Sequence, residues 1–391
     1  MHESWITPGI AEIAPAMIEL RRAIHAQPEL GHEEFLTRER VAQCLQEWGY
    51  QIHPAMAGTA LVATLRNGQG PRLGLRAELD ALPIQEQGER PWRSRTPGKM
   101  HACGHDGHIA MLLAAAWELA RKPAWRGTLQ LFFQPAEEGH GGSGARHMLE
   151  EQVFERFPCD AIFALHNSPG MPLGKFGVLA GPCMASTDNI VILIHGAGGH
   201  GAMPDKTQDP VVIGASLVMA LQSLVSRNAP PSETAIVTVG AFLAGDAANV
   251  IPQRAELRLS VRALQPEVRQ MLRQRIKHLA ELHASSFGAR AEVIFGEGYP
   301  VLVNDPGASA LAAQVIRDWL GEEGLVPDMR PICASDDFAF WLERVPGCYL
   351  LIGNGDGAGG CEVHHPGYDF NDQVLPLGAS FWVRLAQRFL T

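Results

Sequence analysis

The hydrophobic positions along the first half of the chain change between helical and strand spacing. Residues 11–50 carry apolar side chains three to four positions apart and reach a stop at Gly49, which predicts two helices. Residues 107–122 are rich in Ala, Leu and Met without a breaker and predict a buried helix. Short apolar runs with strand length occur at 60–65, 72–79, 128–133 and 161–165. This alternation is typical of an α/β fold with a central mixed, mostly parallel sheet.

A different order of elements begins near residue 186. The pattern predicts a strand, a helix, two strands, a helix and a strand, at 189–194, 210–227, 235–242, 255–261, 267–285 and 291–295. This βαββαβ order is the ferredoxin-like arrangement. After Pro300 the α/β style resumes, with a helix at 308–319, a strand at 349–352 and a closing helix at 377–389. We therefore expect a discontinuous α/β domain, 1–185 and 301–391, and an α+β domain, 186–300, inserted into it.

Composition excludes several classes of partner. The 391 residues have a formal net charge of −10 and no Lys/Arg run, so we expect no nucleic-acid partner. Residues 1–15 lack a basic stretch followed by an apolar core, and apolar stretches such as 211–221 are too short to cross a bilayer, which predicts a cytoplasmic protein without a membrane span. The seven widely spaced cysteines need no disulfides, and six of them are predicted to be buried thiols.

The seventh cysteine, Cys103, belongs to a cluster of polar residues at 101–108, His-Ala-Cys-Gly-His-Asp-Gly-His. A lone His or Cys is more often packed than functional, but this density of polar groups at a helix start would leave several of them unsatisfied unless something binds them. Cys103 and His105, two positions apart, can point at one metal ion. His101 and His108 are candidates for orienting those ligands through hydrogen bonds.

A pair of carboxylates, Glu137 and Glu138, follows the predicted strand 128–133. Paired acids usually form a solvated turn. Adjacent residues in extended backbone point to opposite sides, so here one carboxylate can bind metal while the other removes a proton from water. Three further groups are placed to join them: Asp80 at a strand end, His166-Asn167 after another strand, and His364-His365 in a late loop. Ligands gather outside the carboxyl ends of parallel strands, which makes a shared metal site plausible.

The glycine run 196–201 matches the dinucleotide-binding pattern G-x-G-x-x-G. Pro204 and a polar segment follow it in place of a helix start, and no acidic residue lies near position 221, where a ribose partner would be needed. We therefore expect the run to bring backbone and His200 close to a ligand or another subunit.

Seven motifs, taken in chain order, carry a resemblance to a known family: 76–83, 100–108, 134–139, 164–167, 198–204, 249–252 and 364–366. Together they resemble the M20 metallopeptidase family. The closest match is its amidohydrolase branch of hippurate hydrolases, bacterial N-acyl-amino-acid aminoacylases and plant auxin-conjugate hydrolases. The resemblance spans nearly the whole chain.

The resemblance implies two divalent metal ions per subunit, Mn, Zn, Co or Ni, with five ligands: Cys103, His105, Glu138, His166 and His364. His364 is preferred to His365 because the family's ligand directly follows a hydrophobic residue, here Val363. Glu137 would be the general base, and Asp80 the acidic residue that orients a ligand.

The resemblance also implies that the inserted domain is a lid that dimerises, giving a homodimer or higher homo-oligomer. It would place His200, and with it Asn249, over the substrate of the same or the partner subunit, where His200 would stabilise the oxyanion. The implied reaction is hydrolysis of an N-acyl amino acid, hippurate-like or N-acetylated, to a carboxylic acid and an amino acid.

Three other functions stay open at this point. A dipeptidase or other small-amide hydrolase of the same family would use the same residues. A thiol hydrolase would use Cys103 as nucleophile with a nearby His as base, although the paired glutamates have no role in that scheme. A metal-dependent binding protein without catalysis is also compatible with the fold.

Overall fold

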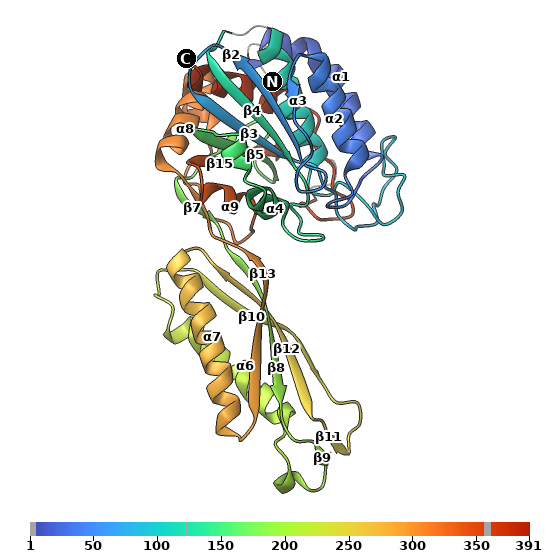
Figure 1. Ribbon diagram of the computed structural model, residues 1–391, viewed down its shortest axis with the longest axis vertical. Helices are drawn as coiled ribbons and strands as arrows, with labels where there is room; N and C mark the ends of the chain where they lie inside the picture. Colours follow the sequence, from blue (N-terminus) through green and yellow to red (C-terminus); the bar gives the residue numbers. More distant parts are fainter. Residues whose placement is uncertain (1–4, 122–123, 356–360) are drawn as a thin grey trace. The chain divides into compact units, whose positions relative to one another are not determined.

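The computed structural model describes residues 5–121, 124–355 and 361–391 (Figure 1). The chain divides into two compact units. The first contains Met1–Gly181, Val303–Arg330 and Phe340–Thr391, and the second contains Pro182–Leu302 and Pro331–Ala339. The domain boundaries predicted at 185/186 and 300/301 stay a prediction.

The first unit is built on one sheet with helices packed on it. Its elements are α1 (Pro8–His25), α2 (Phe35–Glu47), β1 (Gln51–Ile52), β2 (Leu61–Asn67), β3 (Arg72–Glu78), α3 (His105–Arg121), β4 (Gly127–Gln134), α4 (Gly144–Glu150), α5 (Val153–Arg156), β5 (Ala161–Pro169), β6 (Phe176–Gly177), α8 (Pro306–Leu320), the 3-10 turn η3 (Glu322–Gly324), β15 (Gly347–Gly355) and α10 (Leu375–Phe389). Three elements lie where the chain crosses between the units: β7 (Gly181–Met184), β14 (Leu302–Asn304) and α9 (Phe338–Leu342).

The sheet has the order β1-β2-β4-β3-β5-β15-β6. The four inner strands β4, β3, β5 and β15 run parallel, and the outer strands pair antiparallel. The predicted α/β fold with a mixed, mostly parallel sheet is confirmed. Several strands extend beyond their predicted ends, among them β13 and β15. One extension affects the candidate site: β5 does not stop at Leu165 but continues to Pro169, because β15 pairs with it at His166 and Asn167. His166 therefore lies within a strand.

Helix α3 lies between the sheet and the helices α1 and α10, on one face of the sheet (Figure 1). Its sequence is apolar on all sides, and 14 of its 17 residues are buried. It begins at His105, two residues before the predicted start, and the predicted last residue, Lys122, lies outside the described residues. The alternation of β4 sends Leu131 and Phe133 toward this helical layer and Phe132 to the opposite face, against Trp341. The Cys/His cluster is thereby fixed to the most buried helix.

Side-chain caps define where several helices begin. Thr7 accepts a hydrogen bond from the backbone of Ile10 and is followed by Pro8, so α1 begins three residues before the predicted helix. Asp209 and Asp305 cap α6 and α8 in the same way, each followed by proline. Such an acceptor followed by proline satisfies an unpaired backbone donor and presets the first helical residue.

The second unit has the predicted βαββαβ order. Its elements are β8 (Thr187–His195), β9 (Gly199–His200), the 3-10 turn η2 (Pro204–Lys206), α6 (Pro210–Arg227), β10 (Ala235–Ala244), β11 (Val250–Ile251), β12 (Arg254–Ala263), α7 (Pro266–Ser286) and β13 (Arg290–Tyr299). Its four-stranded sheet has the order β10-β12-β8-β13, antiparallel throughout, and α6 and α7 pack together on it (Figure 1). The ferredoxin-like prediction is confirmed.

Helix α6 is long and apolar enough, by length and composition alone, to cross a membrane. A core helix passes the same test, and here Ile213, Leu217 and Leu221 are buried in the core of the second unit. One such helix is weak evidence, and the absence of a membrane span stays a prediction.

All seven cysteines are free thiols. The prediction that the six outside the motif are buried is wrong for most of them. Only Cys348 is buried, Cys333 is exposed, and the others are half-buried. A cysteine side chain is small and only weakly polar, so it can lie on a buried or a half-covered face. Residue type alone therefore does not predict how deeply a cysteine is buried.

Candidate metal centre

The carboxyl ends of the parallel strands carry the chemistry-bearing residues of the first unit. Asp80 lies two residues after β3, Glu137 and Glu138 follow β4, His166 lies in the last part of β5, and His364 lies in the loop after β15. Parallel strands place these ends along one edge of the sheet, where ligands bind in open α/β folds.

Several groups of three potential donors form at this edge, and two of them share Cys103. One group is Cys103, His105 and His166, and the other is Cys103, Glu138 and His364. Within each group the donor atoms lie within 4.8 Å of one another. Cys103 Sγ lies 3.3 Å from His166 Nε2, and Glu138 Oε1 lies 3.1 Å from His364 Nε2. We call the first group the helix-side site and the second the loop-side site.

The buried imidazoles are oriented as metal ligands are. His105 Nδ1 donates to the backbone oxygen of Asp80 at 2.8 Å, and His166 Nδ1 donates to that of Asn167 at 2.7 Å. A carbonyl oxygen can only accept, so each Nδ1 carries a hydrogen, and in the neutral imidazole each Nε2 presents a lone pair. His105 Nε2 is buried without a hydrogen-bond partner. A metal-binding histidine typically bonds its second nitrogen in this manner.

Negative charge surrounds these ligands. Burial alone would lower the pKa of His105, but the hydrogen bond and charge of Asp80, with Glu78 and Glu138, raise that pKa to about 10. Burial, with the charges of Glu138 and Glu137, raises the pKa of the Cys103 thiol well above its ordinary value. A cation would reverse both effects, because it displaces protons from its ligands. Thiolate, imidazole and carboxylate together suit Zn, Mn, Co or Ni.

Asp80 connects the two sites. Its Oδ2 accepts a hydrogen bond from the backbone nitrogen of Glu138 at 2.9 Å, and its Oδ1 lies 3.3 Å from His105 Nδ1. Burial works against ionisation, but these donors lower the pKa of Asp80 below its ordinary value. An ionised Asp80 therefore orients one ligand of each site.

The backbone at Glu137 and Glu138 differs from the extended geometry predicted from the sequence. Both residues lie in a turn, so their carboxylates do not point to opposite sides but reach the same cluster. Glu137 Oε2 lies 3.9 Å from His105 Nε2. The turn arises because Ala136 has a φ of +49°, in the left-handed region. Buried Glu34 accepts a hydrogen bond from the Ala136 nitrogen at 2.9 Å and holds it there.

Residues that are not proposed ligands form a buried layer behind the ligands. Glu78 Oε2 lies 2.8 Å from His108 Nδ1, and His108 Nε2 lies 2.7 Å from Asn167 Oδ1. Asn167 in turn donates to the Tyr368 hydroxyl at 2.7 Å. The sequence predicted that His108 acts through hydrogen bonds and noted Asn167 beside His166. It gave no role to Glu78 or Tyr368, although Glu78 lies in the motif 76–83.

The neighbouring histidine in the late loop has a different environment. His365 Nδ1 accepts from the backbone nitrogen of Gly367 at 3.0 Å, within its own loop, whereas His364 faces Glu138.

His200 and Asn249 belong to the second unit, and that unit brings them together. β9 pairs with β11 so that His200 faces Val250, and the Gly201 nitrogen donates to the Asn249 oxygen at 2.8 Å. Both side chains are exposed. His200 Nδ1 accepts from the backbone nitrogen of Ala202 at 3.0 Å, which leaves the hydrogen on Nε2. Their roles at a substrate stay predictions.

A parallel sheet edge that gathers Cys, His and Glu donors around a buried nitrogen without a hydrogen-bond partner is the arrangement of a metal-binding hydrolase. The model of peptidase family M20/M25/M40 matches residues 74–388. The chain belongs to this family and is a hydrolase of its amidohydrolase branch.

Relatives match along nearly their whole length. The hippurate hydrolase of Campylobacter jejuni is 39% identical over 386 residues, covering 98% of this chain and 99% of the relative. The N-acetyl-L-cysteine deacetylase of Bacillus subtilis is 36% identical, covering 98% and 90%. The crystal structure of a Bacillus subtilis dinuclear metal binding peptidase from the M20 family superposes with a TM-score of 0.83 at 32% identity, covering 97% of this chain and 99% of that one.

Glu34 gives a pH-dependent prediction. Burial, with the charge of Asp80, raises the pKa of Glu34 to about 7, and its other oxygen accepts from the Thr59 hydroxyl at 2.5 Å. The folded state therefore favours the protonated acid, and the free energy of unfolding falls as pH rises from the unfolded pKa near 4.5 through 7. Glu34→Gln is neutral throughout, so its stability relative to wild type should rise by about 2.5 kcal/mol between pH 5 and pH 8.

Thermal unfolding of both proteins across this pH range measures the effect. Glu33→Gln is the control, because Glu33 is solvent-exposed beside Lys99 and should show no such gain. A stability difference between Glu34→Gln and wild type that stays constant with pH would contradict the assignment.

Proposed function

We propose that this protein is a metal-dependent amidohydrolase that cleaves the amide bond of N-acyl amino acids to a carboxylic acid and an amino acid. The observation that carries the proposal is the cluster of Cys, His and Glu donor atoms at the sheet edge, in which His105 Nε2 is buried without a hydrogen-bond partner. Hippurate and N-acetyl-L-cysteine, the substrates named for two relatives, are both N-acyl amino acids. This shared chemistry supports the substrate class.

The two sites around Cys103 would hold two divalent ions. The helix-side site offers His105 and His166, the loop-side site offers Glu138 and His364, and Cys103 is common to both. When bound, the ions would polarise the amide carbonyl and lower the pKa of water. Asp80 orients His105 and Glu138 toward them.

Glu137 is the proposed general base. Its carboxylate lies beside the ligand cluster, with Oε2 3.9 Å from His105 Nε2, and it belongs to neither of the two groups that share Cys103. It accepts a proton from water as the water oxygen attacks the carbonyl carbon. It then donates that proton to the amide nitrogen as the C–N bond breaks, which releases the amino acid.

The second unit is the proposed lid and dimerisation element. His200 Nε2 carries a hydrogen and is exposed, so it can donate to the oxyanion that develops on the carbonyl oxygen. Asn249, next to it, is the proposed substrate contact. The edge strand β10 exposes Phe242 and Leu243, apolar side chains typical of a surface that pairs with another copy. We place the protein in the cytoplasm as a homodimer or higher homo-oligomer.

A thiol mechanism fits this site less well. A nucleophilic cysteine needs a lowered pKa, whereas burial and nearby carboxylates raise the pKa of Cys103. A purely binding role would leave Glu137, an acid beside the cluster, without a purpose.

Substitution of the proposed base tests the mechanism. Glu137→Gln should lower kcat by roughly 10²- to 10⁴-fold, because the amide cannot accept a proton, while metal content stays at the wild-type value. The matched variant is Glu138→Gln, which should lose metal from the loop-side site. Activity close to wild type in Glu137→Gln, measured on metal-replete protein, would refute the assignment of the base.

Chelation separates the metal and thiol mechanisms. Removal of metal with EDTA should abolish hydrolysis, and added Mn²⁺, Zn²⁺ or Co²⁺ should restore it. Iodoacetamide should leave the metal-loaded enzyme active, because a metal-bound thiolate is protected. The test uses a Cys333→Ser background to remove the exposed thiol. Activity that survives EDTA and is lost on alkylation would establish the thiol mechanism instead.

A further inference from the structure

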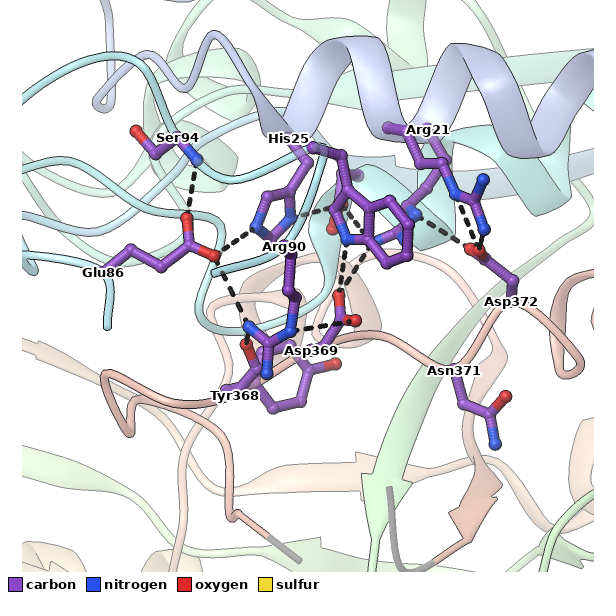
Figure 2. Close-up of polar contacts among 12 residues, drawn as sticks. Arg21, His25, Glu86, Arg90, Ser94, Tyr368, Asp369, Asn371 and Asp372 are labelled. Carbon is purple, nitrogen blue, oxygen red and sulfur yellow. Dashed lines mark hydrogen bonds and ion pairs between the residues drawn. The ribbon is translucent and has the colours of Figure 1, made fainter. Parts of the chain in front are cut away.

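A second cluster of charged side chains, separate from the proposed ligands, takes no part in the proposed chemistry (Figure 2). Helix α1 contributes Arg21 and His25, which are both fully buried. They meet three aspartates: Asp106, near the start of α3, and Asp369 and Asp372, in the loop that precedes α10.

Arg21 contacts all three acids. Its Nη1 lies 3.3 Å from Asp106 Oδ2 and 3.1 Å from Asp369 Oδ1, and its Nε lies 3.0 Å from Asp372 Oδ1. The guanidinium also lies over the rings of Trp92 and Phe370, at 5.4 and 5.9 Å from their centres. A planar guanidinium with several donors can hold three groups in fixed directions, which a lysine ammonium does not do.

The remaining contacts hold the same loop and the same helix start. His25 Nδ1 lies 2.9 Å from Asp106 Oδ2. Arg90 donates to the backbone oxygens of Gly367 and Tyr368, at 2.6 and 2.9 Å, and its Nε lies 3.3 Å from Asp369 Oδ2 (Figure 2). Side chains therefore fix a loop that has no helix or strand of its own between 361 and 374.

Both ends of this network are attached to proposed metal ligands. Asp106 directly follows His105 of the helix-side site, and Asp369 and Asp372 lie a few residues after His364 of the loop-side site. His364 has a φ of +65°, a left-handed conformation that a non-glycine residue keeps only where its surroundings impose it. One backbone bond imposes part of it, from the His364 nitrogen to the Ala102 oxygen at 2.7 Å.

The energetics favour a role in geometry over one in stability. Burying the Arg21 guanidinium and the Asp106 carboxylate, with Asp369 and Asp372 half-buried, costs solvation that their attraction does little more than offset. Apolar residues of similar size commonly stabilise a fold equally well. Apolar side chains would fill this space but would not fix the direction of the loop.

We propose that Arg21 is a positioning residue that holds the His364 loop against the start of α3 and thereby sets the loop-side metal site relative to the helix-side one. The inference rests on the proposed two-metal function.

The two sites depend on Arg21 to different degrees. His105 lies in a regular helix, and Asp106 keeps its contact to His25 when Arg21 is changed. His364 lies in a loop whose acids Asp369 and Asp372 both contact Arg21. Loss of the guanidinium geometry should weaken the loop-side site selectively.

Metal titration by calorimetry with Mn²⁺ and Co²⁺, on the full-length protein stripped of metal, tests this. Wild type should bind two ions in two steps, and His364→Ala identifies the loop-side step. Arg21→Lys should lower the loop-side affinity about 10- to 100-fold, the usual effect of removing a residue that supports a ligand, and change the helix-side affinity less than about 3-fold. Asp369→Asn should also lower the affinity of the loop-side site. Because the Asp369 side chain is partly exposed, this variant provides the test if Arg21→Lys does not fold.

Arg121→Lys is the matched control. Arg121 also joins α3 to α1, through Glu12 at 2.8 Å, but it is half-exposed and touches neither ligand segment, so both affinities should stay at wild-type values. Equal weakening of both steps would show a merely structural role, and two unchanged steps would show no role; either result overturns the proposal. If wild-type protein binds two ions, either of these results contradicts the role of Arg21 but leaves the proposed two-metal function standing. If wild-type protein binds no ions, both the role of Arg21 and the proposed function are contradicted.

Discussion

His105 Nε2 is buried at the carboxyl edge of the central sheet without a hydrogen-bond partner, which costs about 1–3 kcal/mol. Cys103 and His166 form a group of donors with this histidine, and the acids around Cys103 and His105 provide the negative charge that a cation needs. A metal ion is the partner that would satisfy this nitrogen. The hydrogen bonds behind the ligands keep these donors aimed at one place.

Four of the five proposed ligands are held from behind by groups that are not themselves ligands. The Asp80 carboxylate and backbone hold Glu138 and His105, and the Asn167 carbonyl turns His166. Glu34 fixes the left-handed residue before Glu137, and Arg21 connects the helix start to the His364 loop. The arrangement is preorganised, so binding energy need not be spent on ordering the ligands.

The sequence predicted the order of nearly all the longer helices and strands, because strand alternation, the apolar run of α3 and the turn signals are local. It also pointed to Cys103, His105 and Glu138, since these lie in dense polar clusters beside predicted strand and helix ends. His364 was found by resemblance to the family and not by spacing alone.

What the sequence could not predict depends on contacts across the chain. Arg21 and Glu34 are ordinary charged residues of helical or turn segments, and their burial follows from partners 85 and 102 positions away. The extension of β5 through His166 comes from pairing with β15, and the turn at Glu137 comes from the Glu34 contact. The sequence predicted extended backbone at Glu137 and Glu138, and the buried hydrogen bond from Ala136 to Glu34 favours a turn instead.

The central claim is that this cluster is a two-metal site for cleaving N-acyl amino acids. The most direct measurement is the rate of hydrolysis of a panel of N-benzoyl, N-acetyl and longer N-acyl amino acids, with dipeptides for comparison, after reconstitution with Mn²⁺, Zn²⁺, Co²⁺ or Ni²⁺. The account predicts turnover of at least one N-acyl amino acid, faster than of any dipeptide, by protein carrying two ions per chain. Protein that carries two ions and hydrolyses no member of the N-acyl panel would contradict it.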